Sequence, residues 1–502
     1  MRTSNDAASW RLRLRGLPWP AIAIGAALFA ILAAFVSADP ARNVTFSSSP
    51  FSDEGFNVVN ARNLVQLGRW STDEWNLYLV NVPYSLLATM AMSLLGVGIA
   101  AVRLASIACV SAAALALGWG LRRSSGPMWA SVAALSFAGS GLVLYYGRLA
   151  YTEDLVVLAL TLGALILASG SRLSLRWGFV AGACFAVAIG AKPSALFAVA
   201  GIWLAVALGW GWRDAATRRW LAGAASGIAL FGVGWLLLVW LPNRDAVAMD
   251  TRIWAPIHLS LTPAAVAHSI SSYVRGGSDG VIGAMLGPLL ATAGVGVVAI
   301  AGLRKRLDAD QARLAAAAIG WVVVGFGIVV VASYRPNRYV LPMVPGLAIV
   351  AAIGLRLLSE RMAEFKSRAW TGRLPAAVAV LAIVFTVAPG AMLYASWMRQ
   401  ATDGLPAIQD RMAGLVPAGT QVAGRESALF LMKSKAVTVE VQLTQTDTEA
   451  NRGDLYSRGV RWYLQPDTSP APPGVPESVW AQRHELACGS WGGMNECLYQ
   501  LP

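Results

Sequence analysis

The sequence predicts an all-α membrane protein that crosses the bilayer many times and ends in a small α+β domain. Of the 502 residues, 56% are hydrophobic and only 13% are charged, a composition typical of membrane proteins. Apolar runs of about 20 residues, the length that crosses the hydrocarbon core, recur from Trp19 to Leu393. Residues 398–502 instead mix short alternating runs with turn-rich sequence, which indicates a separate domain.

The apolar segments define the predicted transmembrane domain, residues 1–397. They lie at approximately 18–38, 79–100, 103–121, 127–146, 152–169, 176–191, 194–211, 220–241, 280–303, 311–333, 338–358 and 374–394. The first follows a basic stretch and has the general look of a signal peptide. Because it is long enough to span and many more spans follow, we expect it to be retained as the first helix.

Small basic clusters between the apolar runs set the predicted topology. Lys and Arg favour the cytoplasmic side of a membrane, and these clusters all become cytoplasmic if one early segment does not cross. Segment 79–100 is the best candidate, since it contains Pro83, has Gly96 and Gly98 near its end and is followed at once by Arg103. We expect it to form a juxtamembrane or re-entrant segment, which leaves about 11 transmembrane helices.

This topology gathers most of the reactive polar residues on the outer face of the membrane. The first outer loop is 39–102, the second large outer loop is 242–279, and the C-terminal domain, 398–502, is extracytoplasmic. The net charge of +13 is therefore interpreted as a topology signal, not as a nucleic-acid surface. The chain also contains no glycine-rich nucleotide-binding loop, which disfavours a cytosolic nucleotide-sugar enzyme.

The four cysteines divide into two kinds. Cys109 and Cys184 lie inside apolar runs, where a thiol is usually a small core residue. Cys488 and Cys497 lie in the polar tail, at a spacing that allows a small disulfide loop if the tail faces an oxidising compartment. The alternative is a two-thiol metal site, for which His484 is the only nearby imidazole in the sequence.

An acidic pair, Asp53-Glu54, follows the first predicted helix closely. A carboxylate there makes an acceptor hydroxyl or amine a better nucleophile by taking its proton, and a second carboxylate orients the first or holds a cation. The alternative is that both residues merely solvate a loop.

The surrounding motifs resemble the GT-C superfamily of membrane glycosyltransferases, in particular the branch of the protein O-mannosyltransferases and the lipid A aminoarabinose transferase. The matching elements, in order, are Asp53-Glu54-Gly55, Ala61-Arg62, Gly68-Arg69-Trp70, Pro83, Leu94-Leu95-Gly96, Ala101-Val102-Arg103-Leu104, the stretch from Tyr145 to Asp154, Gly190-Ala191-Lys192, and the stretch from Tyr334 to Tyr339 with Pro342 and Pro345. The resemblance covers approximately residues 15–360. It implies that Asp53 is the catalytic base and Glu54 its catalytic partner, and that the donor is a sugar on a polyprenyl phosphate.

Further polar residues at the predicted outer face are candidates for substrate binding. Arg and Lys match phosphate oxygens, and an ionisable residue at a membrane boundary often marks a site. Three alternatives stay open: Glu153 and Asp154 cap a helix, Lys192 extends into the interface, and Arg335 binds lipid headgroups. The complete set of candidates is Arg103, Arg148, Glu153, Asp154, Lys192, Arg335, Arg338 and Tyr339.

The sequence therefore predicts a glycosyltransferase of the bacterial cytoplasmic membrane that acts on its periplasmic side. Its partners would be a polyprenyl-phosphate sugar donor, a lipid, glycan or protein acceptor, and membrane lipids. No metal ligand is assigned, because His258 and His268 form no ligand spacing, although a divalent metal is left open. The competing hypotheses are a transporter or flippase and a non-catalytic assembly or sensor protein. The sugar and the acceptor are not identified by the sequence.

Overall fold

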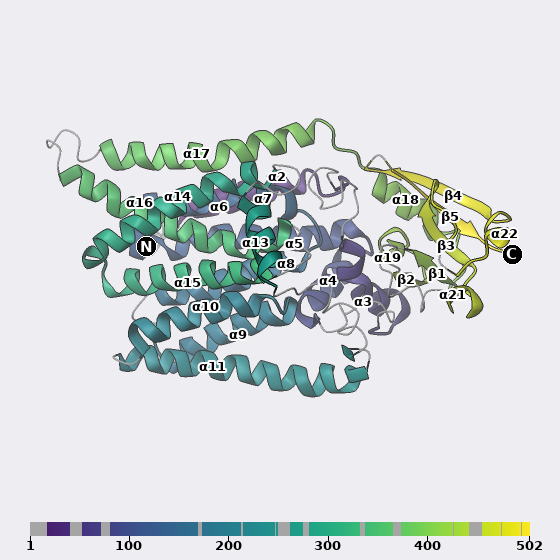
Figure 1. The fold of residues 1–502 in the computed structure, drawn as a ribbon, viewed down its shortest axis with the longest axis horizontal. Helices are drawn as coiled ribbons and strands as arrows, with labels where there is room; N and C mark the ends of the chain where they lie inside the picture. Colours follow the sequence, from purple (N-terminus) through teal and green to yellow (C-terminus); the bar gives the residue numbers. More distant parts are fainter. Residues whose placement is uncertain are drawn as a thin grey trace, which may run out of the picture.

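The chain folds into a long helical bundle with a small mixed α/β domain at one end (Figure 1). The computed structural model describes residues 18–40, 53–71, 81–168, 173–211, 214–245, 247–248, 262–274, 281–331, 337–364, 373–424, 426–440, 454–472, 474–492 and 494–502. The predicted all-α membrane part and the predicted α+β tail are both confirmed.

Helices occupy the apolar segments of the sequence in order, and two more helices lie in the predicted outer loops, at 54–67 and 263–274. The early ones are α2 (Trp19–Ala33), α3 (Glu54–Leu67), α4 (Val82–Leu95), α5 (Ile99–Gly120), α6 (Arg122–Ala138), α7 (Gly141–Tyr146), α8 (Thr152–Leu165), α9 (Leu175–Ala191), α10 (Ala195–Val206) and α11 (Ala215–Trp235). They are followed by α13 (Pro263–Val274), α14 (Val281–Leu303), α15 (Ala309–Val331), the 3-10 segment η8 (Asn337–Met343), α16 (Val344–Glu364) and α17 (Arg373–Met398).

Six helical stretches in the described part of the chain are long and apolar enough to cross a bilayer, and several shorter apolar helices accompany them. The predicted total of about eleven spans stays a prediction. Helix α4 has 14 residues, a length of about 21 Å, which falls short of the roughly 30 Å hydrocarbon core. One face of α4 is buried at Tyr84 and Ser85, while Met90 and Leu94 are exposed. Helices α2, α8 and α10 are similarly short, so the juxtamembrane position of α4 stays a prediction.

Close helix contacts in the bundle depend on glycine. Helices α9 and α11 approach so closely that a Cβ atom built on Gly182 would lie 2.2 Å from the backbone oxygen of Ala224. Gly201 of α10 and Gly320 of α15 meet in the same way, with a built Cβ on Gly201 2.1 Å from the Gly320 oxygen. Small residues at such contacts let helix backbones pack in direct contact, as is common in membrane bundles.

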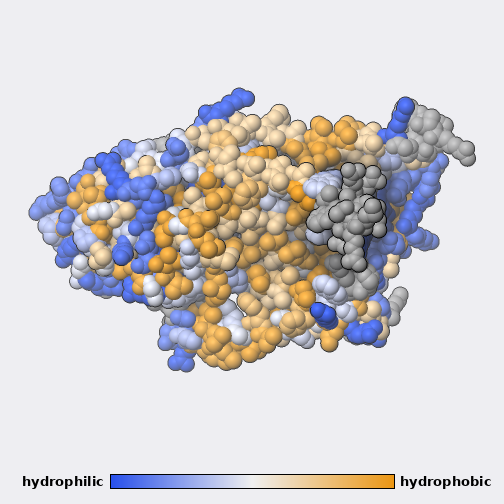
Figure 2. Space-filling model, turned by 180° about the vertical axis from the view of Figure 1, so that it is seen from behind, coloured by the Kyte–Doolittle hydropathy of each residue, from blue (hydrophilic) through white to orange (hydrophobic). Residues whose placement is uncertain are grey.

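Polar residues from distant segments meet at one end of the bundle, which we call the basic end. There Arg356 donates hydrogen bonds to the Ser124 carbonyl (2.9 Å) and the Gln311 side chain (2.8 Å), and Arg313 lies 3.7 Å from Asp214. Figure 2 shows an apolar band around the middle of the molecule, with hydrophilic surface at both ends. The predicted clustering of basic loops on one face therefore corresponds to one physical end of the bundle.

The C-terminal domain lies at the opposite end, beside α3 and α4 (Figure 1). Its five-stranded sheet has the order β2-β1-β3-β5-β4, with parallel pairing of β1 to β2 and β3 and antiparallel pairing of β5 to β3 and β4. The strands are β1 (Gln421–Gly424), β2 (Val437–Glu440), β3 (Trp462–Pro466), β4 (His484–Trp491) and β5 (Met494–Gln500), and the helices are α18 (Gly404–Ala413), α19 (Ser427–Phe430), α21 (Asp454–Ser457) and α22 (Glu477–Trp480).

Cys488 and Cys497 are bonded to each other as a disulfide. They lie directly opposite one another in the β4–β5 ladder, where cross-strand Cβ atoms come close. Of the two alternatives that the sequence left open, the structure therefore has the disulfide.

Candidate functional site

The candidate site begins at Asp53, the residue immediately before α3. The Asp53 side chain is 26% exposed, and its carboxylate forms an ion pair with the guanidinium of Arg338. Arg338 comes from η8, which precedes α16, so this pair joins residues 285 positions apart in the sequence. The first outer loop and the start of a late helix are thus brought together, as the predicted topology requires.

Glu153 and Lys192 extend this pair into a chain of alternating charges. Glu153, at the start of α8, is almost fully buried and forms an ion pair with Lys192 at the end of α9. The Arg338 Nε atom lies 3.4 Å from Glu153 Oε1, and the Thr152 hydroxyl donates to Glu153 Oε2 at 3.0 Å. We call Asp53, Arg338, Glu153 and Lys192 the ionic cluster.

Aromatic rings lie against the two cations of the ionic cluster. Lys192 Nζ lies 4.2 Å from the ring centre of Tyr339, and the Arg338 guanidinium carbon lies 5.1 Å from that of Tyr151. Such contacts favour a cation over a ring face. The cluster holds two acidic and two basic side chains, so its formal charges cancel, and an anion that enters must compete with Asp53 and Glu153 for the cations.

Glu54 points into the protein and is fully buried. Arg103 donates two hydrogen bonds of 2.7 Å to its carboxylate oxygens, and the Ala150 amide donates a third, also of 2.7 Å. Burial raises the pKa of Glu54, but the attraction and hydrogen bonds of Arg103 outweigh it and hold the pKa below its ordinary value. Glu54 thus anchors the first turn of α3, while its neighbour Asp53 faces the ionic cluster.

Arg103 and Arg148 bind the end of the first helical segment. Arg103 donates to the carbonyls of Val36 (2.9 Å) and Ala38 (2.8 Å), in addition to Glu54. Arg148 donates to the carbonyls of Ala38 and Asp39, both at 2.7 Å, and its guanidinium lies 4.1 Å from the ring centre of Trp397. These arginines hold the chain where it leaves α2, at the end of the bundle opposite the basic end.

The remaining predicted residues are placed differently. Asp154 is fully buried, and its carboxylate accepts no hydrogen bond within the part of the chain that the structure describes. Tyr339 borders the ionic cluster through Lys192. Arg335 lies outside the described residues, as does half of the predicted second outer loop, 242–279.

Asp39 and Arg62 are buried charged residues to which the sequence assigned no role, although Ala61-Arg62 was one of the elements that resemble the GT-C family. The Asp39 carboxylate accepts hydrogen bonds from the backbone amides of Gly404, Leu405 and Gly492 and from the Thr402 hydroxyl, at 2.7 to 3.1 Å. Arg62 of α3 donates to backbone carbonyls between Leu431 and Ala436. Both residues bind the C-terminal domain. Their sequence signal is weak, because their partners are backbone groups, which every residue carries.

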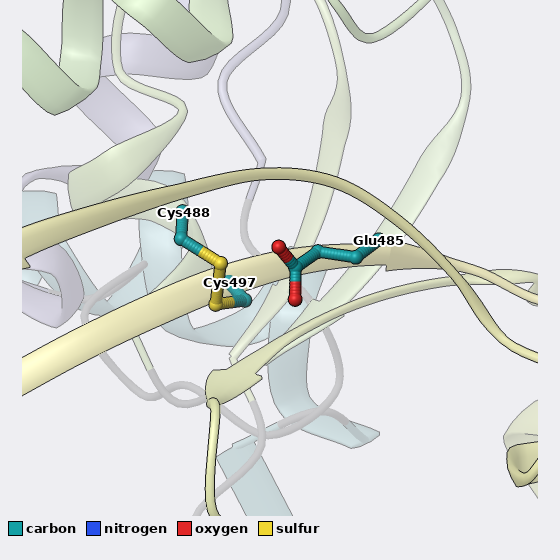
Figure 3. Close-up of side chains that lie close together, drawn as sticks. All are labelled: Glu485, Cys488 and Cys497. Carbon is teal, nitrogen blue, oxygen red and sulfur yellow. A yellow bond between two sulfur atoms is a disulfide. The ribbon is translucent and has the colours of Figure 1, made fainter.

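The residues of the ionic cluster do not fit a divalent cation. The two carboxylates that such an ion would need, Asp53 and Glu153, each face a cationic side chain. A different group of potential ligands, Glu485, Cys488 and Cys497, lies on the C-terminal sheet (Figure 3). Its two sulfurs are bonded to each other, so neither is a thiolate that binds metal.

Solved structures share this architecture. The lipid A aminoarabinose transferase ArnT from Cupriavidus metallidurans, bound to undecaprenyl phosphate, matches with a TM-score of 0.62 over 95% of this chain and 97% of its own, at 16% identity. The oligosaccharyltransferase AglB from Archaeoglobus fulgidus, in complex with an inhibitory peptide and a dolichol-phosphate, matches with a TM-score of 0.54 over 88% of this chain and 69% of its own, at 12% identity. Both are GT-C glycosyltransferases. The chain has the GT-C fold.

The GT-C fold was the family resemblance indicated by the sequence, and the structural comparison confirms it at the level of the fold. The arabinofuranosyltransferase AftD from Mycobacteria also matches, with a TM-score of 0.55 and 14% identity over 96% of this chain but only 40% of its own length. The chain is thus similar in extent to ArnT and much shorter than AftD. No protein-family model and no curated protein sequence matches it.

Proposed function

We propose that this protein is a glycosyltransferase that moves a sugar from a polyprenyl-phosphate donor to a lipid, glycan or protein acceptor. The observation that carries the proposal is the ionic cluster at one end of a GT-C bundle, in which a partly exposed carboxylate, Asp53, pairs with Arg338, and Glu153 links Arg338 to a second cation, Lys192. The ArnT and AglB structures contain undecaprenyl phosphate and a dolichol-phosphate, and both of these lipids are polyprenyl phosphates.

Arg338 and Lys192 are the proposed phosphate-binding residues. Arg338 presents a planar set of N–H donors that matches two phosphate oxygens, and Lys192 adds a point charge. Both lie near the ends of helices, so a lipid phosphate held there leaves its chain within the bilayer. During transfer the phosphate leaves with the bonding electron pair, and the two cations stabilise its developing negative charge.

Asp53 is the proposed general base. When the phosphate takes over the N–H groups of Arg338, Asp53 loses its ion-pair partner and becomes free to accept the acceptor's proton. The acceptor oxygen or nitrogen then attacks the anomeric carbon as the bond from that carbon to the phosphate oxygen breaks. A single displacement of this kind inverts the anomeric configuration. Asp53 is therefore free to act as a base only when the donor phosphate is bound.

The remaining candidates receive supporting roles in this proposal. Glu54 forms an ion pair with Arg103, and Arg103 and Arg148 donate hydrogen bonds to backbone carbonyls. We therefore propose that these three residues have a structural role in the site. This differs from the catalytic role predicted for Glu54 and the substrate-binding role predicted for the two arginines. The physical reason is burial, because none of the three side chains is accessible to a substrate. Tyr339 holds Lys192 in position, and Asp154 has no assigned part.

We further propose that the site faces the periplasm of a bacterial cell, with the protein in the cytoplasmic membrane. The basic end of the bundle then lies in the cytoplasm, as positively charged loops prefer. The disulfide of the C-terminal domain lies on the opposite side, where an oxidising compartment preserves it.

The test compares cell-envelope glycolipids and glycans by mass spectrometry in cells with and without the gene. A sugar missing from the deletion strain identifies product and acceptor together. The strain is then complemented with the wild-type protein, with Asp53→Asn or with Asp403→Asn, a matched change at an exposed position outside the cluster. We expect the product to return with wild type and Asp403→Asn only, at equal amounts of inserted protein. Full product with Asp53→Asn would refute the assignment of the base.

A further inference from the structure

The C-terminal domain is attached to the membrane domain by two buried polar contacts of opposite charge. In the first, the Asp39 carboxylate accepts hydrogen bonds from the domain's amides, including those of Leu405 (3.0 Å) and Gly492 (3.0 Å). In the second, the Arg62 guanidinium donates hydrogen bonds to the domain's carbonyls. We call these the Asp39 clamp and the Arg62 clamp.

The Arg62 clamp binds the same helix that carries the proposed base. Arg62 is fully buried, and its Nη2 atom donates to the carbonyls of Leu431 (2.9 Å), Ser434 (2.7 Å) and Ala436 (2.9 Å). Its Nε atom also donates to Leu431 at 3.2 Å. The three carbonyls converge on one guanidinium, so the arginine fixes the loop between α19 and β2 against α3.

The domain also touches the first turn of α3, next to Asp53. A Cβ atom built on Gly55 would lie 3.2 Å from both the Cβ and the backbone nitrogen of Leu429 in α19. A side chain at position 55 would require Leu429 to move by a few tenths of an ångström. Helix α3 is therefore held on one side by Arg103 and Ala150 through Glu54, and on the other side by the C-terminal domain through Gly55 and Arg62.

We propose that the C-terminal domain is a working part of the active site, with Arg62 as a positioning residue that sets where α3 presents Asp53. Arg62 lies eight residues beyond Glu54, about 12 Å along the helix axis. Two anchors at that separation fix the direction of a helix more firmly than the contacts of Glu54 and Asn57 near its first turn. A misplacement of about 1 Å at a reacting group costs roughly a hundredfold in rate. This inference rests on the proposed function.

The kinetic test separates donor binding from transfer in Arg62→Ala. Helix α3 contributes neither Arg338 nor Lys192, and a displaced Asp53 competes less with a phosphate for Arg338, so binding of undecaprenyl phosphate, used as the probe, should be at least as strong as in wild type. Product formation per inserted protein should fall at least tenfold or so. Arg62→Lys, which keeps the charge but not the planar fork, should lie between the two. Arg69→Ala is the matched control, because Arg69 is exposed just beyond the end of α3.

An engineered disulfide between α3 and the C-terminal domain provides a second test, in which the rate of cross-linking does not depend on turnover. In a Gly55→Cys and Leu429→Cys double variant, the two Cβ atoms, 3.2 Å apart as built, must separate by a few tenths of an ångström to reach the Cβ separation of a disulfide. We expect a mild oxidant to cross-link the pair rapidly when Arg62 is present and at least several-fold more slowly with Arg62→Ala. In the Arg62→Ala background, forming the cross-link should raise product formation, and reducing it with a dithiol should reverse the gain. Arg62→Ala without the cysteine pair controls for effects of the dithiol on the native disulfide.

The outcomes are distinct. Wild-type product formation with Arg62→Ala, or a cross-linking rate that does not depend on Arg62, overturns the proposal. If Arg62→Ala does not accumulate in the membrane, Arg62→Lys takes its place, and wild-type turnover by that variant overturns the proposal equally. Loss of undecaprenyl phosphate binding in parallel with turnover also overturns it, because it indicates general unfolding. If the wild-type protein forms no product at all, the proposed function fails, while the cross-linking rates still decide whether Arg62 positions α3.

Discussion

Replacing Glu54 with glutamine will remove one charge from a fully buried ion pair and leave the other in place. Glutamine has nearly the shape of glutamate, so the change creates no cavity. Its amide nitrogen, however, is a donor and must face a donor of Arg103 or the amide of Ala150, which now share the glutamate oxygens at 2.7 Å. Arg103 keeps its hydrogen bonds to the Val36 and Ala38 carbonyls but loses its counter-ion.

The expected loss of stability is large because neither partner of this pair reaches solvent. Both side chains are 0% exposed, and removing one partner of a buried ion pair costs about 3–5 kcal/mol. Exposed ion pairs have much weaker effects. The matched change is therefore Glu364→Gln, which removes a carboxylate that is bound by Arg306 and Arg361 but is 47% exposed.

The assay is unfolding of the purified protein in a titration of mixed detergents, followed by the change in helical signal. Glu54→Gln should shift the unfolding free energy by the stated amount, while Glu364→Gln should lie close to wild type. Equal midpoints for Glu54→Gln and wild type would refute the reasoning, since they would mean that the buried pair is not formed in the membrane.

Three further predictions follow from other parts of the structure. The pKa of Glu54 is held below its ordinary value of 4.5. The stability that its charge contributes is therefore complete above that pH and is lost as the pH falls through the lower pKa of the folded state. Glu54→Gln should lack this acid-dependent loss when unfolding is measured from pH 7 downward. Gly182→Ala should destabilise the bundle by about 1–3 kcal/mol, because the added Cβ would lie 2.2 Å from the Ala224 oxygen. Gly232→Ala in α11 is the control, because a Cβ there meets nothing within 4 Å, and it should be neutral or stabilising by up to about 1 kcal/mol. Equal thermal midpoints for the two variants would contradict the packing argument. Replacing Cys488 and Cys497 together by serine opens a loop of sequence separation 9 and should lower the stability of the C-terminal domain by about 2–3 kcal/mol. The measurement is the rate of proteolysis of that domain, which should rise. An unchanged rate would show that the sheet alone fixes this hairpin.

The helical part of the fold was predictable because apolar length is a strong signal. A buried helix in lipid needs a continuous apolar run, and the runs in the sequence coincide with helices between α2 and α17, whereas α3 and α13 lie in the predicted outer loops and carried no such signal. The ionic cluster was also within reach, because Asp53, Glu153, Lys192 and Arg338 are charged residues at the ends of apolar segments. The topology placed them on one side, and the structure joins them in one chain of contacts.

The division of labour between Asp53 and Glu54 was not predictable from the sequence. Adjacent residues at the start of a helix point in different directions, and the identity of each partner depends on tertiary packing. Arg148 illustrates the same limit. Its hydrogen-bond partners are the carbonyls of residues 38 and 39, and a carbonyl has no residue-specific signature. An arginine that binds backbone therefore looks the same in a sequence as one that binds phosphate.

The two clamps also impose an order on biosynthesis. Asp39 and Arg62 are synthesised early, but the backbone groups that neutralise them belong to residues 402–405, 431–436 and 492. A ribosome must therefore reach residue 436 before the carbonyl partners of Arg62 exist, and residue 492 before all the partners of Asp39 exist. Until then α3 lacks its contacts with the C-terminal domain. Under the proposed function, a nascent chain therefore carries the Asp53 carboxylate before the domain that helps to position it has been made.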